Sequence, residues 1–567
     1  MVNEHMSKFV IYQVLPRLFG NSNTTNKPHG SINENGCGKF NDLTSKVLKE
    51  IKALGVTHIW YTGIIEHATQ TDYSTYDIRK DHPAVVKGKA GSPYAIKDYY
   101  DVDPDLAVDV VNRIGEFEAL VARTHKAGMK VIIDFVPNHV AREYYSDARP
   151  EGVQDLGEED AKDKSFAQNN NFYYLPYQKF SPSFDVQDYE EYPAKVTGND
   201  QFTASPDIND WYETVKLNYG VDYLNDKRQH FDPVPDTWHK MLDILLFWAE
   251  KEVDGFRCDM AEMVPVEFWQ WAIACVKKQY PAVIFIAEVY NPHEYRNYIF
   301  TGGFDYLYDK VGMYDLLRNI VCHQHAASQI TQAWQALSGI EDYMLHFLEN
   351  HDEQRIASDF FAGNAWIIIP ALIVSATLTK APFMLYAGQE LGEQGMDTEG
   401  FSGLDGRTTI FDYWGVKSLQ DWSNKGKFDG KLLSDEQKAL RALYKKLLNL
   451  SLKEPAIAKG KMYDLQYANF NNPSYDTNRQ FAYFRQYGKD LLLIVVNFAS
   501  SSTDISINIP QGAFEYLVLA LSSKVEMEDL MDQQYQLSTI LSADNQVELT
   551  IPAHSGRILK IKNTQES

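Results

Sequence analysis

Residues 130–139 spell KVIIDFVPNH, and this stretch decides the fold that the sequence predicts. Its first part, Lys130–Phe135, is a short run of mainly β-branched and aromatic residues without regular alternation, which is typical of a strand buried on both faces. Helix-like segments separate this run from others of its kind. The other runs are Phe9–Val14, Thr57–Tyr61, Gly255–Cys258, Val283–Ala287, Tyr306–Tyr308, Tyr343–Phe347 and Phe383–Tyr386. Eight strands that alternate with helices predict a (β/α)8 barrel, the TIM barrel fold.

Two departures from this alternation indicate further domains. A segment rich in Asn, Asp, Tyr and Pro, about a hundred residues long, follows the third strand, and a structureless loop of that length is improbable in a compact domain. After Leu452 short strand-like runs follow without a long helix, one of them at Tyr516–Leu519, which is typical of an all-β sandwich. We therefore predict a barrel of residues 1–139 and 219–455, an inserted subdomain after strand 3 at residues 140–218, and a C-terminal β-sandwich at residues 456–567.

The overall charge excludes some classes of partner. The chain has 567 residues with 54 Lys and Arg against 77 Asp and Glu, which gives a formal net charge of −23. Such a charge opposes binding to a phosphate backbone or to an anionic membrane surface. No glycine-rich phosphate loop follows a predicted strand. We therefore expect neither a nucleic acid nor a membrane as a partner, and the charge favours a neutral or cationic ligand.

The cysteines and the apolar stretches indicate in which cellular compartment the protein works. None of the cysteines forms a CxxC pair, so neither a disulfide framework nor a zinc site is indicated. The N-terminal stretch Met1–Val10 lacks the apolar core of a secretory signal, and Ala365–Leu378 is too short to span a bilayer. We expect a cytoplasmic protein, with a periplasmic or secreted protein that has lost its leader as the alternative. The oligomeric state stays open.

Acidic side chains follow several of the predicted strands. The third strand ends in Asp134, the fourth leads to Asp259, the fifth ends at Glu288, and the seventh leads to Asp352. Barrel enzymes carry their catalytic groups at the carboxyl ends of the strands. We therefore expect these carboxylates to meet at one rim. A single strand-end carboxylate more often caps a helix, so the shared placement carries the prediction.

Spacing along the strands sharpens the chemistry. Arg257 and Asp259 are two residues apart and face the same side of their strand, where the guanidinium lowers the pKa of the carboxyl and keeps it ionised. An ionised carboxylate suits a nucleophile. Glu288 follows an apolar run, and burial raises the pKa of a carboxyl and suits it to donate a proton. These two states are what retaining glycoside cleavage requires, with the carboxyl groups about 5–5.5 Å apart.

Four stretches in this order resemble the conserved regions of the α-amylase family, glycoside hydrolase family 13. They are DFVPNH at 134–139, GFRCD at 255–259, IAEVY at 286–290 and ENHD at 349–352. A further match, TVKLN at 214–218, resembles the region that closes the inserted domain in this family, and its form leans towards the neopullulanase or cyclomaltodextrinase members, with an α-amylase as the other possibility. The resemblance covers nearly the whole chain, including the inserted subdomain and the C-terminal β-domain.

The resemblance implies roles for individual residues. Asp259 is similar to the family nucleophile, Glu288 to the general acid/base, and Asp352 to the third carboxylate, which binds sugar hydroxyls. Four residues match positions that contact the sugar at the cleavage point, namely Tyr94, His139, Arg257 and His351. Asp134 matches a position that supports the geometry of the site.

The resemblance also implies a substrate, and it leaves alternatives open. We expect hydrolysis of α-1,4-glucosidic bonds in starch-like glucans or maltooligosaccharides. The alternatives are a transglycosylase or isomerase, such as a trehalose synthase-like enzyme or a glucanotransferase, and a non-catalytic sugar-binding barrel. The stretch Met260–Met263 matches neither sequence common after the family nucleophile, so the acceptor preference is open.

A metal is the remaining expectation. The chemistry needs no cofactor, but Asn138 matches a position that often ligates structural calcium through oxygen. Its partners in the inserted subdomain cannot be assigned from the sequence. A hydrogen-bonding Asn at a turn accounts for Asn138 equally well.

Overall fold

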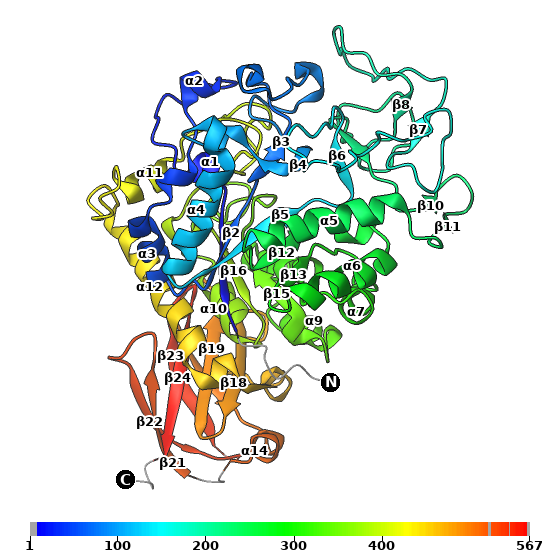
Figure 1. Ribbon diagram of the computed structural model, residues 1–567. Helices are drawn as coiled ribbons and strands as arrows, with labels where there is room; N and C mark the ends of the chain where they lie inside the picture. Colours follow the sequence, from blue (N-terminus) through cyan, green and yellow to red (C-terminus); the bar gives the residue numbers. More distant parts are fainter. Residues whose placement is uncertain (1–7, 520–522, 544, 564–567) are drawn as a thin grey trace.

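The computed structural model describes residues 8–519, 523–543 and 545–563, and a closed barrel of parallel strands forms the centre of this part of the chain (Figure 1). Each barrel strand overlaps one of the predicted runs, so the predicted TIM barrel is confirmed. In order around the barrel the strands are β1 (Val10–Val14), β16 (Phe383–Tyr386), β15 (Met344–Phe347), β14 (Tyr306–Tyr308), β13 (Ile284–Ala287), β12 (Gly255–Cys258), β5 (Lys130–Phe135) and β2 (His58–Tyr61).

The strands are mainly apolar because both of their faces are buried. Ile11, Trp60 and Met384 belong to the cluster that fills the barrel interior. Their neighbours Val10 and Tyr12 belong to the larger core outside the barrel, since successive side chains of a strand point to opposite faces. Helices cover this outer core. They include α3 (Ser45–Ala53), α4 (Arg113–Lys126), α5 (Asp236–Glu250), α6 (Val266–Gln279), α7 (Tyr295–Phe300), α8 (Asp315–Val321), α9 (Gln329–Ala336), α10 (Ile369–Thr377) and α12 (Asp435–Lys453).

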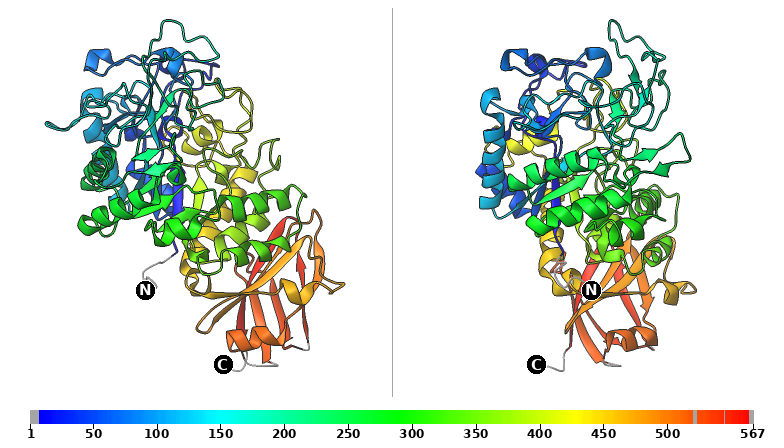
Figure 2. Two further views of the ribbon diagram at one scale, coloured as in Figure 1. Left: turned by 90° about the vertical axis from the view of Figure 1, so that its right-hand side faces the viewer. Right: turned by 45° about the vertical axis from the view of Figure 1, so that its right-hand side comes forward.

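The chain leaves the barrel after β5 and forms a subdomain of short antiparallel pairs. The pairs are β6 (His139–Ala141) with β9 (Thr214–Lys216), β7 (Tyr174–Leu175) with β8 (Ala194–Lys195), and β10 (Val221–Asp222) with β11 (Arg228–Gln229). Tyr173, Phe180 and Val196 belong to a small core that also includes Val85, from the segment after β2. Because β6 starts four residues after the end of β5, this subdomain stands at the carboxyl end of the barrel strands. The views of Figures 1 and 2 place it at the far end of the molecule from the C-terminal strands.

A second excursion follows β2. Its strands β3 (Ile65–His67) and β4 (Ile96–Val102) form an antiparallel pair, and a long loop connects them. After β4 the chain returns to the barrel. The excursion lies next to the inserted subdomain, because the backbone N–H of Tyr145 donates to the carbonyl of Lys97 at 3.1 Å. Both excursions therefore surround the same end of the barrel.

The C-terminal region is an all-β domain, as the sequence predicts. In its described residues, a six-stranded antiparallel sheet and a two-stranded sheet share one apolar core that includes Leu493, Ile505 and Val547. The larger sheet has the order β17 (Lys461–Asp464), β18 (Gln480–Tyr487), β19 (Asp490–Asn497), β24 (Ser555–Asn563), β21 (Ser523–Asp529) and β22 (Gln536–Leu541). The smaller sheet pairs β20 (Thr503–Asn508) with β23 (Gln546–Ile551).

One predicted strand of this domain is wrong. Residues Tyr516 and Leu517 lie in the short helix α14 (Gln511–Leu517) instead of in a strand. The helix buries Ala513, Phe514 and Leu517, which recur at helical spacing and pack into the domain core. The helical spacing of these three apolar side chains outweighs the aromatic character that favoured a strand.

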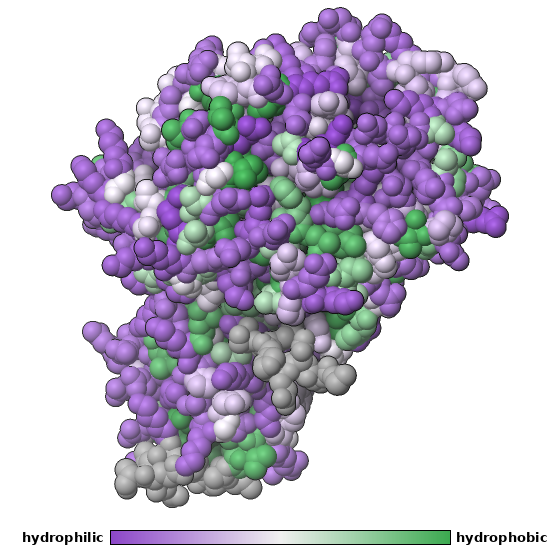
Figure 3. Space-filling model, viewed as in Figure 1, coloured by the Kyte–Doolittle hydropathy of each residue, from purple (hydrophilic) through white to green (hydrophobic). Residues whose placement is uncertain are grey.

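The surface is described by its hydropathy. The face shown in Figure 3 is largely hydrophilic, and its apolar residues lie in scattered patches. Within the described residues, no helix has both the length and the apolarity that a bilayer crossing requires.

Candidate active site

The three predicted carboxylates line one cavity at the carboxyl end of the barrel. Asp259 follows β12, Glu288 follows β13, and Asp352 follows β15 after a short loop. Tyr94 and His139 line the same cavity, whose volume is about 350 Å3. The remaining lining residues were not predicted, and they are Lys87, Ser92, Trp211, Glu213, Thr214, Met260, Tyr290, Ile410 and Phe411.

Arg257 lies beneath this cavity and joins two of the carboxylates. Its guanidinium donates to Asp259 at 2.7 Å and forms an ion pair with Glu288 at 2.9 Å. Asp134 Oδ1 lies 3.7 Å from the same group. Arg257 is 1% exposed, and the ring of Tyr308 lies 5.4 Å from its guanidinium. One fully buried cation therefore fixes the positions of both Asp259 and Glu288.

Burial is the largest influence on the pKa values of these two carboxyls. Burial raises the pKa of Asp259 above its ordinary value, and the charge of Arg257 offsets only part of that effect. The net lowering that the sequence predicts for Asp259 is therefore not found. Burial also raises the pKa of Glu288, with Arg257 opposing and the charge of Asp259 adding to the rise. Both carboxyls are thus desolvated, and Arg257 is the main group that favours their ionised forms.

Glu288 has two further partners that the sequence analysis missed. The hydroxyl of Tyr290 donates to Glu288 Oε1, and the backbone N–H of Met260 donates to Oε2 at 2.9 Å. Met260 has a φ of 41°, a left-handed conformation that is uncommon for a residue with a side chain. The sequence could have indicated the contact of Tyr290 with Glu288. Tyr290 is two residues from Glu288, and side chains two residues apart on an extended chain face the same side.

His351 and Tyr94 support Asp352 from behind. His351 Nε2 lies 3.1 Å from Asp352 Oδ2 and also contacts the Tyr94 hydroxyl, while its Nδ1 lies 2.8 Å from Gln13 Nε2. Burial lowers the pKa of His351 well below its ordinary value, so the ring is neutral. The rings of Tyr94 and His351 stack with their centroids 5.1 Å apart. The Asp352 side chain itself remains 41% exposed in the cavity, as a group that meets a ligand must be.

Asp134 does not line the cavity and lies deeper in the barrel. It accepts hydrogen bonds from Trp60 Nε1 at 3.0 Å and from the backbone N–H of Gly63 at 3.2 Å. Burial raises the pKa of Asp134 to about 7. These contacts are those of a residue that orients Arg257 and the strands around it.

The inserted subdomain and the excursion after β2 complete the cavity. The Trp211 ring lies 5.2 Å from the His139 ring, and His139 Nε2 lies 4.0 Å from Asp259 Oδ2. Lys87 and Glu213 form an ion pair at 3.0 Å across the two excursions. No local pattern marked Trp211, Lys87 or Glu213, because their place at the cavity depends on how two irregular segments pack together.

The surroundings of Asn138 do not fit a calcium ion. Calcium takes six to eight oxygen ligands, which requires the oxygens to be free of other cations. Asn138 Oδ1 instead accepts a hydrogen bond from the ammonium of Lys216 at 2.7 Å, and its Nδ2 donates to the carbonyl of Gly198 at 2.8 Å. The same ammonium lies 2.6 Å from Asp200 Oδ1. A side-chain cation already lies against the oxygen that was expected to bind the metal.

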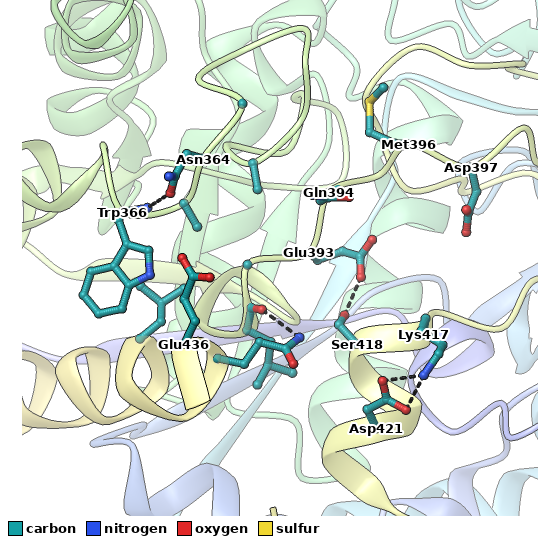
Figure 4. Close-up of a pocket in the computed structure, with 17 residues that line it drawn as sticks. Asn364, Trp366, Glu393, Gln394, Met396, Asp397, Lys417, Ser418, Asp421 and Glu436 are labelled. Atoms are coloured by element: carbon teal, nitrogen blue, oxygen red, sulfur yellow. Dashed lines mark hydrogen bonds and ion pairs between the residues drawn. The ribbon is translucent and has the colours of Figure 1, made fainter. Parts of the chain in front are cut away.

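A second cavity, of about 490 Å3, carries different chemistry (Figure 4). In it Lys417 pairs with Asp421 at 2.6 Å, and Ser418 donates to Glu393. None of the predicted site residues lines it, although all of them lie in the described part of the chain. The candidate active site is therefore the cavity that holds Asp259 and Glu288.

Comparison with known proteins agrees with this geometry. The family model described as alpha amylase, catalytic domain, matches residues 13–438, and the one described as alpha amylase, C-terminal all-beta domain, matches residues 470–562. A cyclomaltodextrin glucanotransferase of Geobacillus stearothermophilus is 24% identical over 532 residues, which cover 89% of this chain and 62% of that protein. The chain therefore spans about three fifths of the length of that relative.

Alpha-amylase 3 of Dictyoglomus thermophilum is also 24% identical, over an alignment that covers 80% of this chain and 79% of that protein. Among solved structures, the alpha-amylase of Geobacillus thermoleovorans in complex with acarbose has a TM-score of 0.63 at 19% identity. That alignment covers 98% of each chain, so the two proteins share the whole fold. The catalytic-domain match takes in the barrel, the inserted subdomain and the cavity with its three carboxylates, and on this evidence the chain belongs to the α-amylase family.

Proposed function

We propose that this protein is a retaining glycoside hydrolase that cleaves α-1,4-glucosidic bonds in starch-like glucans or maltooligosaccharides. The observation that carries the proposal is the shared guanidinium of Arg257, which lies 2.7 Å from Asp259 and 2.9 Å from Glu288 at the base of one cavity. Two carboxyl groups that face one cavity are the machinery of glycoside cleavage, and the α-amylase family, to which the chain belongs, cleaves with retention.

The chemistry divides between the two carboxyls. Ionised Asp259 attacks the anomeric carbon and forms an ester, while Glu288 gives its proton to the departing glycosidic oxygen as the carbon–oxygen bond breaks. Glu288 then takes a proton from water, whose oxygen attacks the anomeric carbon and releases Asp259. The raised pKa of Glu288 suits the first step, and the contact with Arg257 favours the ionised form of Asp259.

The other residues of the site bind the sugar in this proposal. Asp352 accepts hydrogen bonds from sugar hydroxyls, Tyr94 stacks under the ring, and His139 contacts the sugar at the cleavage point. Arg257 and His351, which were also expected to contact the sugar, do not line the cavity and instead hold the carboxylates that do. The burial of a neutral His351 behind Asp352 supports this assignment, because a neutral ring can donate one hydrogen bond without adding charge.

The cavity also supports a preference for short substrates. Its volume of about 350 Å3 lies near the lower end of the range for ligand pockets, about 300–1,000 Å3. The Lys87–Glu213 ion pair closes part of its wall. We therefore expect maltooligosaccharides to be better substrates than polymeric starch.

A transglycosylase is the second candidate, because the relatives include a cyclomaltodextrin glucanotransferase. Both reactions pass through the same ester, and the acceptor that reaches it decides between them. Incubation with maltotriose and separation of the products distinguishes the two, since hydrolysis gives shorter sugars alone. Longer oligomers or a rearranged disaccharide would favour transfer or isomerisation.

Substitution of the nucleophile tests the proposal as a whole. Asp259→Asn is expected to abolish turnover of maltotriose without lowering the melting temperature. The first product released by the wild type is expected to be the α-anomer, which proton NMR detects before mutarotation. Turnover by the Asp259→Asn variant, a β-anomeric product, or sugar binding without turnover by the wild type would reject it. The last outcome would indicate a non-catalytic sugar-binding barrel.

We also propose that the protein works in the cytoplasm. Support comes from its four cysteines, which are all free thiols, as is usual in a reducing compartment. Fractionation of the source cells followed by immunoblotting tests this, and recovery from the periplasm or the medium would reject it.

A further inference from the structure

Lys216 lies at the junction between the barrel and the inserted subdomain. It is the last residue of β9, which pairs with β6 directly beyond the end of β5. Its side chain is 2% exposed, so its ammonium has lost nearly all contact with bulk water. A buried ammonium is costly unless protein groups replace its hydration.

Groups from both sides of the junction supply that replacement. Asn138, just after β5, accepts a hydrogen bond from Lys216 Nζ at 2.7 Å. Asp200, in the inserted subdomain, lies 2.6 Å from the same nitrogen. The ring of Tyr223 lies 5.3 Å away and adds a cation–π contact. The ammonium therefore sits between an amide oxygen, a carboxylate oxygen and an aromatic face.

The orientation of Asn138 is fixed by the same arrangement. Its Nδ2 donates to the carbonyl of Gly198 in the inserted subdomain, at 2.8 Å, which turns the amide oxygen towards Lys216. The packing is close, because a Cβ on Gly198 would lie 3.0 Å from the His139 side chain. His139 lines the active-site cavity, so this junction also holds a part of the cavity wall.

We propose that the ammonium of Lys216 takes the place of a divalent cation at this junction, so that the inserted subdomain is held to the barrel without calcium. An oxygen-lined position between two domains is what a structural calcium ion would need, and here a positive charge from the chain itself occupies it. A calcium ion would lie against the ammonium and would be repelled by it. The proposal does not depend on the reaction that the enzyme catalyses.

The wild-type protein gives the first test. Its apparent melting temperature is expected to be the same in excess EDTA as in calcium chloride, and metal analysis of the purified protein is expected to find less than one calcium ion per ten chains. A fall in melting temperature with EDTA, or one tightly held calcium ion per chain, would overturn the proposal. Neither measurement requires activity or a variant that folds poorly.

Replacing the lysine gives the second test. Lys216→Met removes the charge and is expected to lower the apparent melting temperature by several degrees and to hasten proteolytic cleavage within residues 140–218. Lys179→Met is the matched control, because Lys179 lies in the same subdomain but forms an exposed ion pair with Glu190. The proposal is wrong if the two variants melt and are cleaved alike.

Discussion

Replacing Arg257 by methionine, which has similar length but no charge, would leave two buried carboxylates without their counter-ion. The guanidinium lies 2.7 Å from Asp259 and 2.9 Å from Glu288, and it is 1% exposed. Removing one partner from a buried ion pair costs about 3–5 kcal/mol of unfolding free energy. Because the two pairs share one guanidinium, we expect a loss in this range and not twice as large.

The loss of stability in Arg257→Met is expected to depend on pH, and the direction follows from the two carboxyls. The pKa values of Asp259 and Glu288 are raised in the folded protein, so the native state holds more protons than the unfolded chain above about pH 4. In that window the unfolding free energy falls as pH rises. The charge of Arg257 lowers both pKa values, so its removal raises them further. The deficit of Arg257→Met is therefore expected to be larger at about pH 8 than at about pH 5, where a larger share of these carboxyls is protonated.

Calorimetric melting of both proteins at the two pH values measures this difference. Arg149→Met is the control, because Arg149 is 27% exposed against 1% for Arg257, so water screens its ion pair with Asp155, at 3.0 Å, more strongly and a smaller loss is expected. Residual turnover of Arg257→Met is expected to have both limbs of its pH profile moved upward. A variant as stable as the control at pH 8, or one that loses more stability at pH 5, would refute the reasoning.

Three further substitutions test separate parts of the structure. Tyr290→Phe removes a hydrogen bond that lowers the pKa of Glu288, so the basic limb of kcat/KM is expected to move to higher pH; a fixed limb would contradict this. Trp211→Ala is expected to raise KM for maltotriose about tenfold, equivalent to ~1.4 kcal/mol, with little change in melting temperature, and an unchanged KM would place Trp211 outside the binding path. Arg485 is buried and donates hydrogen bonds to four backbone carbonyls, among them those of Leu378 after α10 and Gly460 before β17. Arg485→Met is therefore expected to lower the unfolding free energy, measured with denaturant, by about 3 kcal/mol or more. A loss below 1 kcal/mol would show that water replaces these hydrogen bonds.

Much of the barrel could be predicted from local sequence alone. Strands buried on both faces must be apolar without alternation, and β5, β12, β14 and β16 have the very bounds that their apolar runs indicate. The carboxylates follow from the same reasoning, because the chain direction fixes which end of a parallel strand a residue occupies. Asp259 and Glu288 could thus be placed at one rim before any contact was known.

Some consequences of burial could not be predicted in the same way. The sequence indicated correctly that Arg257 faces Asp259, but not that desolvation outweighs the guanidinium and raises the pKa of that carboxyl. Desolvation depends on how completely the surrounding segments cover a group, which no spacing rule describes. The helix α14 was missed for a related reason, since its buried face is defined by a core built from distant strands.

The sequence by itself determined the barrel, the order of its strands and the residues at their carboxyl ends, because those depend on local apolar runs and chain direction. The tertiary structure alone decided the walls of the cavity and the junction at Asn138. Trp211, Lys87 and Glu213 come from irregular segments whose packing has no local periodicity. The ammonium of Lys216 meets Asn138 across 78 residues of chain, and such a contact depends on the shape of the folded inserted subdomain.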